Sequence, residues 1–462
     1  MAERKKVKKV NLHKQKANKH KTIYNNVPSR KKSKSFKTED IVMESAELKR
    51  PVRNKAKQPP RTAYKNQTEV YRKSTPDKSK TKKSKSINWR IIGGTKLKAR
   101  RNRYVTLFVV FPLILALMLF IFLTPTGPIE AVTNAFAKIG GGTFPKSVVG
   151  SKLVSLKSEG NTAFLLTNTH ISGYTSSGKE LFEYQHNFSS PVLKTSSTRS
   201  LVFNRQGTGY IVLNSSSAVY NKEYSKPIYC GDIADDGTIA FATKSDKYSA
   251  QVDVFGKNLK HKFSWFSVDG LISDMALSND GNYIAIAVLK AKDGTYLSEI
   301  HLFNINSDKE LYSIAVEGSP IYGLENISSR YFSYTTDSAV TFSKWTEKEE
   351  KKIEKLGLSP SFYKNTGNLN VVVFGKNTSS NISIIKNTGE EAGNFSYNGL
   401  IDDISVTDKN VYILKGNKIF ILDFTGKTID TVSTEQTPYA IASSKNGVFA
   451  AENVNLLYFE RG

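Results

Sequence analysis

Cysteine is almost absent from this sequence, with one residue, Cys230, in a chain of 462. A single thiol excludes a disulfide framework and every zinc or iron–sulfur site that needs several cysteine ligands. Histidine is also scarce: there are six, two of them among the first 20 residues and the other four far apart. None shows an HExxH or similar ligand spacing. The sequence therefore predicts no metal site of these kinds.

Signatures of catalysis are missing as well. The chain contains no GxSxG, Walker A or dinucleotide-binding motif, and the GGGT at 140–143 follows a helical pattern instead of a strand, so we interpret it as a linker. His301 lies in the alternating run EIHLF and is expected to face solvent, while Cys230 is expected to be a small buried residue. We therefore predict no catalytic residue, no cofactor-binding residue, no metal ligand and no enzymatic activity.

Two pairs of neighbouring carboxylates, Asp235-Asp236 and Asp402-Asp403, are the nearest approach to a cation site. Both pairs fall at turns or at the start of a strand. Asx turns, in which the side chain accepts a hydrogen bond from the backbone two residues on, explain them without a bound calcium ion.

The positive charge of the chain is confined to its beginning. Residues 1–103 hold 34 Lys and Arg against 7 Asp and Glu, whereas the remaining 359 residues hold 33 against 34. This excludes a protein that is basic throughout and binds nucleic acid over its whole surface. Because apolar residues in 1–103 are scattered without a period, we predict a disordered basic tail there.

Residues 104–123 form an uncharged run, YVTLFVVFPLILALMLFIFL. A helix of 20 residues is about 30 Å long, which matches the hydrocarbon thickness of a bilayer, so we predict a transmembrane helix. Five basic residues lie between 96 and 103, and no Lys or Arg follows the run until Lys138. The positive-inside rule then predicts a cytoplasmic N-terminus and an extracytoplasmic C-terminal domain. A cleaved signal peptide is the alternative, since residues 135–137 resemble a cleavage site, but it would require a charged region of 103 residues.

A short apolar stripe follows this run. Ile129, Val132, Phe136 and Ile139 are spaced by three, four and three residues, as on one side of a helix. Two interpretations stay open: an amphipathic helix lying on the outer leaflet, or a stalk helix packed on the next domain. We assign residues 124–143 to this juxtamembrane stalk and its Gly-rich linker.

From residue 144 to residue 462 the sequence repeats one pattern. Short β-branched and aromatic runs alternate with turns such as DDGT at 235–238 and NDGN at 279–282. First strands of the repeats are expected near eight positions, at intervals of about 36 to 50 residues, which with four strands each is typical of propeller blades. These positions are Leu153, Val192, Ile228, Leu271, Ile321, Phe362, Leu400 and Tyr439. The fold class predicted is all-β, a propeller of seven or eight blades. Only residues 345–357 show a short helical charge pattern.

The hairpin NDGNYIAIAV at 279–288, preceded by DMALS, resembles the first turn of blades in the WD40 and quinoprotein-like propeller superfamilies. The layout of basic tail, single span and propeller resembles a family of uncharacterised single-pass bacterial membrane proteins, known only as a domain of unknown function. The Gly-His and Trp-Asp pairs of WD40 repeats are missing, and three Trp are too few for the repeated tryptophan motifs of quinone-dependent dehydrogenases. The resemblance therefore implies a fold and a membrane location but no functional residue.

The last repeat lacks a strand. From residue 439 to residue 462 there is room for three strands, and a blade with three would leave an open ring and an unpaired edge. The unassigned segment FPKSVV at 144–149 is expected to pair with residues 455–460 as the outer strand of this blade.

These patterns favour a membrane-anchored, non-catalytic binding or scaffold protein of the cell envelope, whose partner is an extracytoplasmic protein or glycan. The tail is expected to associate with anionic lipid and, as a weaker alternative, with nucleic acid. Two further alternatives stay open: a hydrolase or lyase at the mouth of the propeller channel, and a membrane tether for nucleic acid. An enzyme would require two or more ionisable groups converging at the inner strands.

Overall fold

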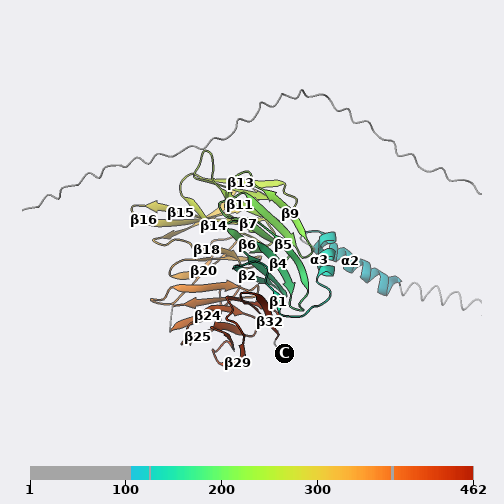
Figure 1. Ribbon diagram of the computed structural model, residues 1–462. Coiled ribbons are helices and arrows are strands. Elements are labelled where there is room, and N and C mark those ends of the chain that lie inside the picture. Colours follow the sequence, from blue (N-terminus) through green and yellow to red (C-terminus); the bar gives the residue numbers. More distant parts are fainter. Residues whose placement is uncertain (1–105, 124–125, 308, 376–378, 461–462) are drawn as a thin grey trace, which may run out of the picture. The chain divides into compact units, whose positions relative to one another are not determined.

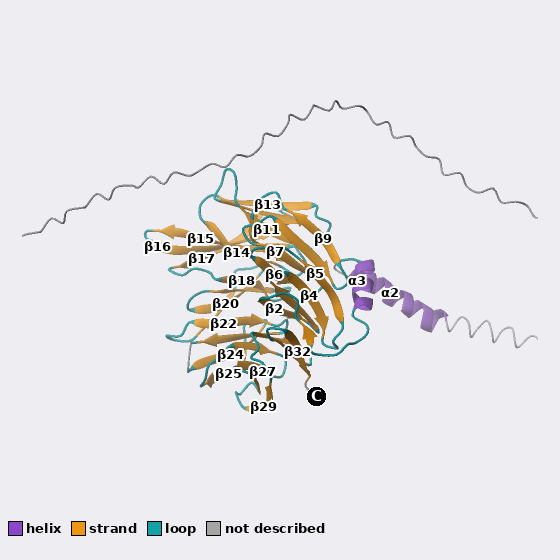
Figure 2. Ribbon diagram, viewed as in Figure 1, coloured by secondary structure: helices purple, strands orange, loops and turns teal. Residues whose placement is uncertain are grey.

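Alternating apolar residues and tight turns produce a series of antiparallel hairpins (Figures 1 and 2). The computed structural model describes residues 106–123, 126–307, 309–375 and 379–460. The basic tail predicted for 1–103 lies outside these residues. Within them, the chain forms 32 strands in eight four-stranded antiparallel sheets. The prediction of an all-β propeller is confirmed, and the number of blades is eight.

The first four blades follow each other along the chain, and each begins with its inner strand. Blade 1 contains β2 (Leu153–Glu159), β3 (Thr162–Thr167), β4 (His170–Thr175) and β5 (Glu180–Gln185). Blade 2 contains β6 (Pro191–Thr195), β7 (Arg199–Asn204), β8 (Gly209–Asn214) and β9 (Ala218–Glu223). Blade 3 contains β10 (Ile228–Ile233), β11 (Ile239–Thr243), β12 (Ala250–Phe255) and β13 (His261–Ser267). Blade 4 contains β14 (Leu271–Leu277), β15 (Tyr283–Lys292), β16 (Thr295–Asn304) and β17 (Lys309–Glu317).

The second half of the ring repeats this order. Blade 5 contains β18 (Gly323–Asn326), β19 (Tyr331–Thr335), β20 (Ala339–Lys344) and β21 (Glu350–Glu354). Blade 6 contains β22 (Pro360–Asn365), β23 (Leu369–Phe374), β24 (Ser380–Lys386) and β25 (Glu391–Tyr397). Blade 7 contains β26 (Asp403–Val406), β27 (Val411–Lys415), β28 (Lys418–Leu422) and β29 (Thr428–Ser433). Blade 8 contains β30 (Ala440–Ser444), β31 (Gly447–Ala451), β32 (Asn455–Glu460) and β1 (Lys146–Ser147). Every inner strand begins within three residues of its predicted position.

The eighth blade is closed by the start of the domain. β1 pairs antiparallel with β32, with Lys146 opposite Leu456 and Ser147 opposite Asn455. The prediction that 144–149 supplies the missing outer strand is confirmed. The reason is that an outer strand taken from the other end of the chain joins both ends of the ring in one sheet.

The core is divided between the blades. Eight apolar clusters fill the eight interfaces between neighbouring blades, including the one between blade 1 and blade 8. Central strands such as β3 and β23 are buried along their whole length, because both faces of each sheet contact a neighbour. Their runs of Val, Ile, Leu and Phe follow from this burial on both faces.

One local pattern was misread from the sequence. Residues 345–357 show a helical charge pattern, but residues 350–354 form β21, the outer strand of blade 5. A helix is therefore wrong for this segment. The charged residues are explained instead by the solvated face of an outer strand. The Glu and Lys side chains of β21 reach water, and Ile353 is the one residue of this strand that is buried against the blade.

The described residues form three helical segments before the propeller. The predicted span 104–123 begins outside the described residues, and its described part forms a π-helical turn, η1 (Thr106–Val110), followed by α2 (Phe111–Leu123). Among the residues that the structure describes, no helix is both long enough and apolar enough to cross a bilayer. The third segment, α3 (Pro128–Ala137), carries the apolar stripe.

Candidate functional site

All eight blades contribute residues to one polar cavity at an end of the central channel. Its volume is about 460 Å³. The wall comes from the ends of the inner strands and from the turns that lead to the second strands, among them Lys157, Lys194, Asp232, Glu325, Lys364, Ser405 and Ala442. The residues lie about 40 positions apart in sequence, so ring closure alone brings them together.

Three aspartates of this region hold neighbouring blades together. Asp232 of blade 3 accepts a hydrogen bond from the amide of Leu277 in blade 4 at 2.8 Å. Asp274 of blade 4 accepts one from the amide of Leu324 in blade 5 at 2.9 Å. In each case a carboxylate on one inner strand pairs a backbone donor on the next, and a charged acceptor makes such a bond stronger than one between neutral groups.

The third aspartate adds an ion pair to this arrangement. Asp403 of blade 7 accepts the amide of Ile441 in blade 8 at 2.8 Å, and the Lys364 amine of blade 6 lies 2.6 Å from its carboxylate. The same amine also donates to the carbonyl of Ile441 at 3.0 Å. Lys364 thus connects three consecutive blades.

Other ionisable groups at the cavity have no such bond. Within the described part of the chain, the Lys157 amine and the carboxylates of Glu159 and Glu325 make no hydrogen bond or close ion pair. Burial, reinforced by the neighbouring Lys194 charge, lowers the pKa of Lys157. Burial, together with the nearby Asp235 carboxylate, raises the pKa of Glu159 to about 7. These three side chains are available to a ligand.

The carboxylate pairs flagged by the sequence have different roles. Asp236 accepts the Thr238 amide at 2.8 Å and so forms the predicted Asx turn. The same explanation is wrong for Asp235, which binds the Ser197 amide of blade 2 at 2.7 Å and the Asn279 amide group of blade 4 at 2.6 Å.

The second pair departs from the prediction as well. Asp402 accepts the Gly416 amide at 2.6 Å across its own blade, and Asp403 belongs to the contacts between blades 6, 7 and 8. Asx turns were expected because the turn sequence is local. The contacts that replace them join residues of different strands or blades, which a local pattern does not reveal.

Cys230 and the four histidines of the described residues lie outside the cavity wall. Cys230 is buried in the interface between blades 3 and 4, as predicted, and burial raises the pKa of its thiol. His301, expected to face solvent, is only partly exposed, with 17% of its side chain accessible. Its ring lies 5.2 Å from the Trp265 ring, and its Nδ1 lies 2.8 Å from the Glu310 carboxylate. In the described residues, no group of three or more potential ligands is placed to hold a metal ion.

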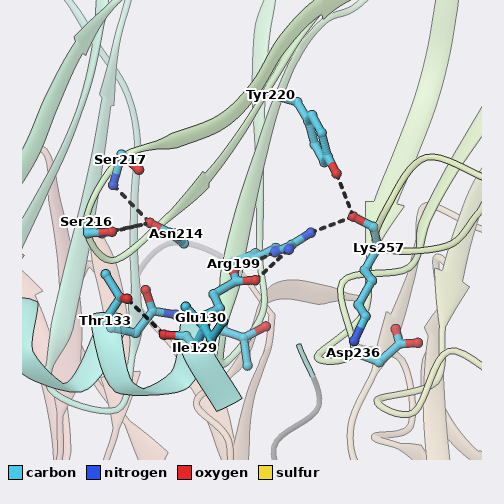
Figure 3. A network of polar contacts seen from close by, with 12 residues as sticks. Ile129, Glu130, Thr133, Arg199, Asn214, Ser216, Ser217, Tyr220, Asp236 and Lys257 are labelled. Atoms are coloured by element: carbon cyan, nitrogen blue, oxygen red, sulfur yellow. Dashed lines mark hydrogen bonds and ion pairs between the residues drawn. The ribbon is translucent and has the colours of Figure 1, made fainter. Parts of the chain in front are cut away.

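A second feature is the contact between helix α3 and the propeller (Figure 3). The Glu130 carboxylate receives two hydrogen bonds from the Arg199 guanidinium, at 2.8 Å from Nε and 2.6 Å from Nη2. Arg199 stands at the start of β7 and also donates to the Lys257 carbonyl at 3.1 Å. The Ser215 amide donates to the Asn134 side chain at 3.1 Å. Blade 2 thus binds α3 through its polar side, and blade 3 helps to hold Arg199 through the Lys257 carbonyl.

The glycine segment after α3 is fixed to blade 1. The Gly142 amide donates to the Ser177 carbonyl at 2.8 Å, and the Lys179 amine donates to the Ile139 carbonyl at 2.5 Å. A side chain at position 142 would collide with the Gly178 carbonyl, so the close approach of the two backbones requires glycine there.

The helix and the cavity lie at the same end of the ring. In an antiparallel blade of four strands, the turn between strands 1 and 2 and the turn between strands 3 and 4 lie at the same end. The cavity uses the first kind of turn, whereas the second kind binds α3 at Ser215 of blade 2 and binds Ile139, just after α3, at Lys179 of blade 1. Lys138 at the end of α3 and Glu159 of the cavity also line one small recess together.

Several solved structures align with this chain. Sqt1 from Saccharomyces cerevisiae aligns with a TM-score of 0.50 and 12% identity, over 69% of this chain and 98% of that one. BamB from Moraxella catarrhalis aligns with a TM-score of 0.46 and 12% identity, over 69% and 99%. Apo AztD from Citrobacter koseri aligns with a TM-score of 0.46 and 14% identity, over 66% and 90%. At such identities the likeness concerns the fold alone.

No protein with a curated description matches the chain. A family model does match, over residues 147–454, which run from the closing strand of blade 8 to the turn before its last strand. This segment covers more than half of the chain and includes every inner strand. The chain therefore belongs to a family of unknown function, DUF5711.

Proposed function

We propose that this protein is a single-pass, membrane-anchored β-propeller of the cell envelope that binds an extracytoplasmic protein or glycan without converting it. Its N-terminal 103 residues face the cytoplasm, where the basic tail meets anionic lipid. Its propeller lies outside the membrane, and the polar cavity is the binding site.

The anchoring rests on the distribution of charge and apolarity in the sequence. An uncharged run of 20 residues follows five basic residues and precedes a neutral segment. α3 supports the proposal because its apolar stripe follows this run within 16 residues and is exposed. The anchor would place the propeller at the outer surface, where envelope ligands are available.

The cavity is the observation that carries the binding function. Inner strands of seven blades and the turn after the inner strand of blade 4 line it, and Lys157, Glu159 and Glu325 in its wall have no bonding partner among the described residues. Partly buried charges without partners are unfavourable unless a ligand or water satisfies them. A rigid ring that holds such groups is suited to recognise a polar group of a partner.

Crosslinking in intact cells tests the binding function. The full chain is compared with a double variant, Lys157→Gln with Glu325→Gln, and with the control Lys415→Gln, which changes an exposed lysine at the end of β27. We expect wild type and control to capture the same envelope protein or glycan and the double variant to lose it. Identical capture by all three proteins would show that the cavity does not bind the partner.

Labelling with a membrane-impermeant amine reagent tests the topology. In intact cells with an open cell wall, Lys415 should be modified, whereas Lys5 and Lys9 should be modified only after lysis. Modification of the two tail lysines but not of Lys415 would reverse the orientation.

A hydrolase or lyase at the channel mouth is the second candidate. The observation that favours it is that Lys157 and Glu159 both lie in the cavity wall. Burial lowers the pKa of Lys157 and raises the pKa of Glu159, so the uncharged form of each side chain is favoured. In that case Glu159→Gln would retain the captured ligand but abolish its conversion. If wild type and variant return the ligand unchanged, the enzyme hypothesis is refuted.

A further inference from the structure

α3 has two sides that differ in what they contact. Its polar side is bound to the propeller through Glu130 and Asn134, and the Arg199 partner of Glu130 is almost fully buried, with 5% of its side chain exposed. The apolar side faces away: Ile129, Val132, Phe136 and Ile139 are 83%, 41%, 68% and 65% exposed. No residue of α3 is buried. The helix thus shows the reverse of the usual arrangement, in which the apolar side packs on the domain.

Ion pairing explains why the helix keeps this orientation. Glu130 lies in the first turn of α3, where a carboxylate also interacts favourably with the helix dipole. Its bidentate bond to a buried guanidinium is geometrically specific, so rotating α3 to bury the stripe would leave Arg199 buried without its carboxylate. The apolar stripe is therefore held outward by the propeller itself.

The surroundings of the stripe indicate what covers it. α3 begins five residues after the end of α2, whose exposed side chains are apolar as well. Two exposed lysines flank the helix: Lys138 at its C-cap and Lys257, whose amine lies beside Gly127 at its start. An apolar strip between cations, continuous with an apolar segment, fits the headgroup–acyl boundary of a lipid bilayer.

We propose that α3 lies flat in the outer leaflet and holds the propeller with its cavity end toward the bilayer. The inference rests on the proposed membrane anchoring and goes beyond it, because a tether alone would leave the propeller free to rotate. It follows that the ligand of the cavity reaches it from the layer next to the membrane. Glu130 and Arg199 are positioning residues in this arrangement.

Site-directed spin labelling of the full chain in vesicles of phosphatidylethanolamine and phosphatidylglycerol tests the proposal. Single cysteines are introduced as Phe136→Cys in the stripe, Lys260→Cys at the tip of the β12–β13 turn and Leu356→Cys after β21 at the other end of the ring. The native Cys230 is buried and stays unlabelled. Collision of each nitroxide with oxygen, with a water-soluble nickel complex and with a nickel-chelating lipid is measured.

At position 136 we expect oxygen collisions to exceed those with the soluble nickel complex several-fold. The position 260 nitroxide should be broadened by the nickel lipid, and the position 356 nitroxide should respond only to the soluble complex. Adding Glu130→Ala should remove the nickel-lipid effect at 260, because the propeller then turns freely, while 136 stays in the lipid. The positioning role would be refuted if, in the Glu130→Ala variant, position 136 lost its excess of oxygen collisions while position 260 kept its broadening by the nickel lipid.

The outcomes separate the two proposals. If the chain is washed from the vesicles by alkaline carbonate, the membrane anchoring itself is wrong. If the chain is retained but the position 136 nitroxide meets the nickel complex as freely as position 356 does, anchoring stands and the helix placement is wrong. Spin–spin broadening between copies at 136, without lipid exposure, would assign the stripe to a second copy of the chain and overturn the lipid assignment.

Discussion

The closure of the ring can be weakened at one aromatic side chain, Phe144. Its ring lies 6.2 Å from that of Phe449 and 5.7 Å from that of Tyr458, so it packs against two strands of blade 8. Phe144 is half-buried in the cluster between blades 8 and 1. The change Phe144→Ala removes this packing without touching the backbone of β1.

The expected loss follows from burial. Replacing a fully buried Phe by Ala costs about 3–5 kcal/mol, so a half-buried ring should contribute about 2–3 kcal/mol to the free energy of unfolding. A chain that begins at residue 153 also loses the Val148 amide bond to Val454 at 2.8 Å and the Thr167 hydroxyl bond to Val149 at 2.9 Å. At about 1 kcal/mol per hydrogen bond, the chain that begins at residue 153 should lose roughly 5 kcal/mol of its free energy of unfolding in total.

Urea unfolding monitored by tryptophan fluorescence measures these differences, since Trp265 and Trp345 both lie in the propeller. Phe266→Ala is the matched control: this ring is exposed and lies 5.2 Å from Tyr248, far from the closure. We expect the control to change the free energy of unfolding by less than about 1 kcal/mol. If chains beginning at 143 and at 153 unfold at the same urea concentration, the closing strand does not stabilise the ring.

Three further changes test the channel and the core. The pKa of Glu159 is about 7 in the folded protein, whereas its ordinary value is 4.5. The folded state therefore binds this proton more tightly than the unfolded state, and the free energy of unfolding should fall as pH rises from about 4.5 to 7. Glu159→Gln should remove this fall and add about 1–2 kcal/mol at pH 8, allowing for partial solvent access, as measured by urea unfolding across pH. Asp403→Asn should lower the free energy of unfolding by about 2–4 kcal/mol in a thermal melt, because Lys364 loses its carboxylate partner. Trp345→Phe should cost about 1–3 kcal/mol in urea, because the buried indole donates to the Ser328 carbonyl at 3.2 Å.

Each of these changes has an opposing result, and the two carboxylate changes also have a control. Glu180→Gln alters an exposed carboxylate and should leave the pH profile unchanged; a Glu159→Gln profile identical to wild type would contradict the raised pKa. Asp430→Asn alters an exposed aspartate of β29, and an equal effect of both Asp changes would show that the Lys364 ion pair is not responsible. Trp345→Phe without any loss would mean that neither the indole bond nor its volume matters.

Much of the fold could be predicted because its signals are local. A turn such as DDGT and the apolar run after it lie within ten residues, so each hairpin is visible in the sequence. Repeating the hairpin pairs eight times then predicts a propeller. The closing strand could also be inferred, because the last unit is visibly one strand short.

The candidate site could not be predicted in the same way. Lys157, Lys194 and Glu325 each stand alone in their own repeat, where a charged residue at the end of a strand is unremarkable. One signal was present: Asp232, Asp274 and Asp403 occupy equivalent places in their units, each followed by an apolar residue and then a small one. In the structure each of these aspartates accepts a backbone amide of the next blade.

By itself, the sequence determined the repeat of strands, the asymmetry of charge between tail and domain, and the uncharged run, because composition and short-range periodicity are properties of neighbouring residues. Only the tertiary structure decided that eight blades close the ring, that charges from separate blades meet in one cavity, and that α3 docks by its polar side. The periodicity of α3 shows an apolar stripe but not where it points. That direction depends on Arg199, 69 residues after Glu130 in the chain, and on the buried ion pair that the two form.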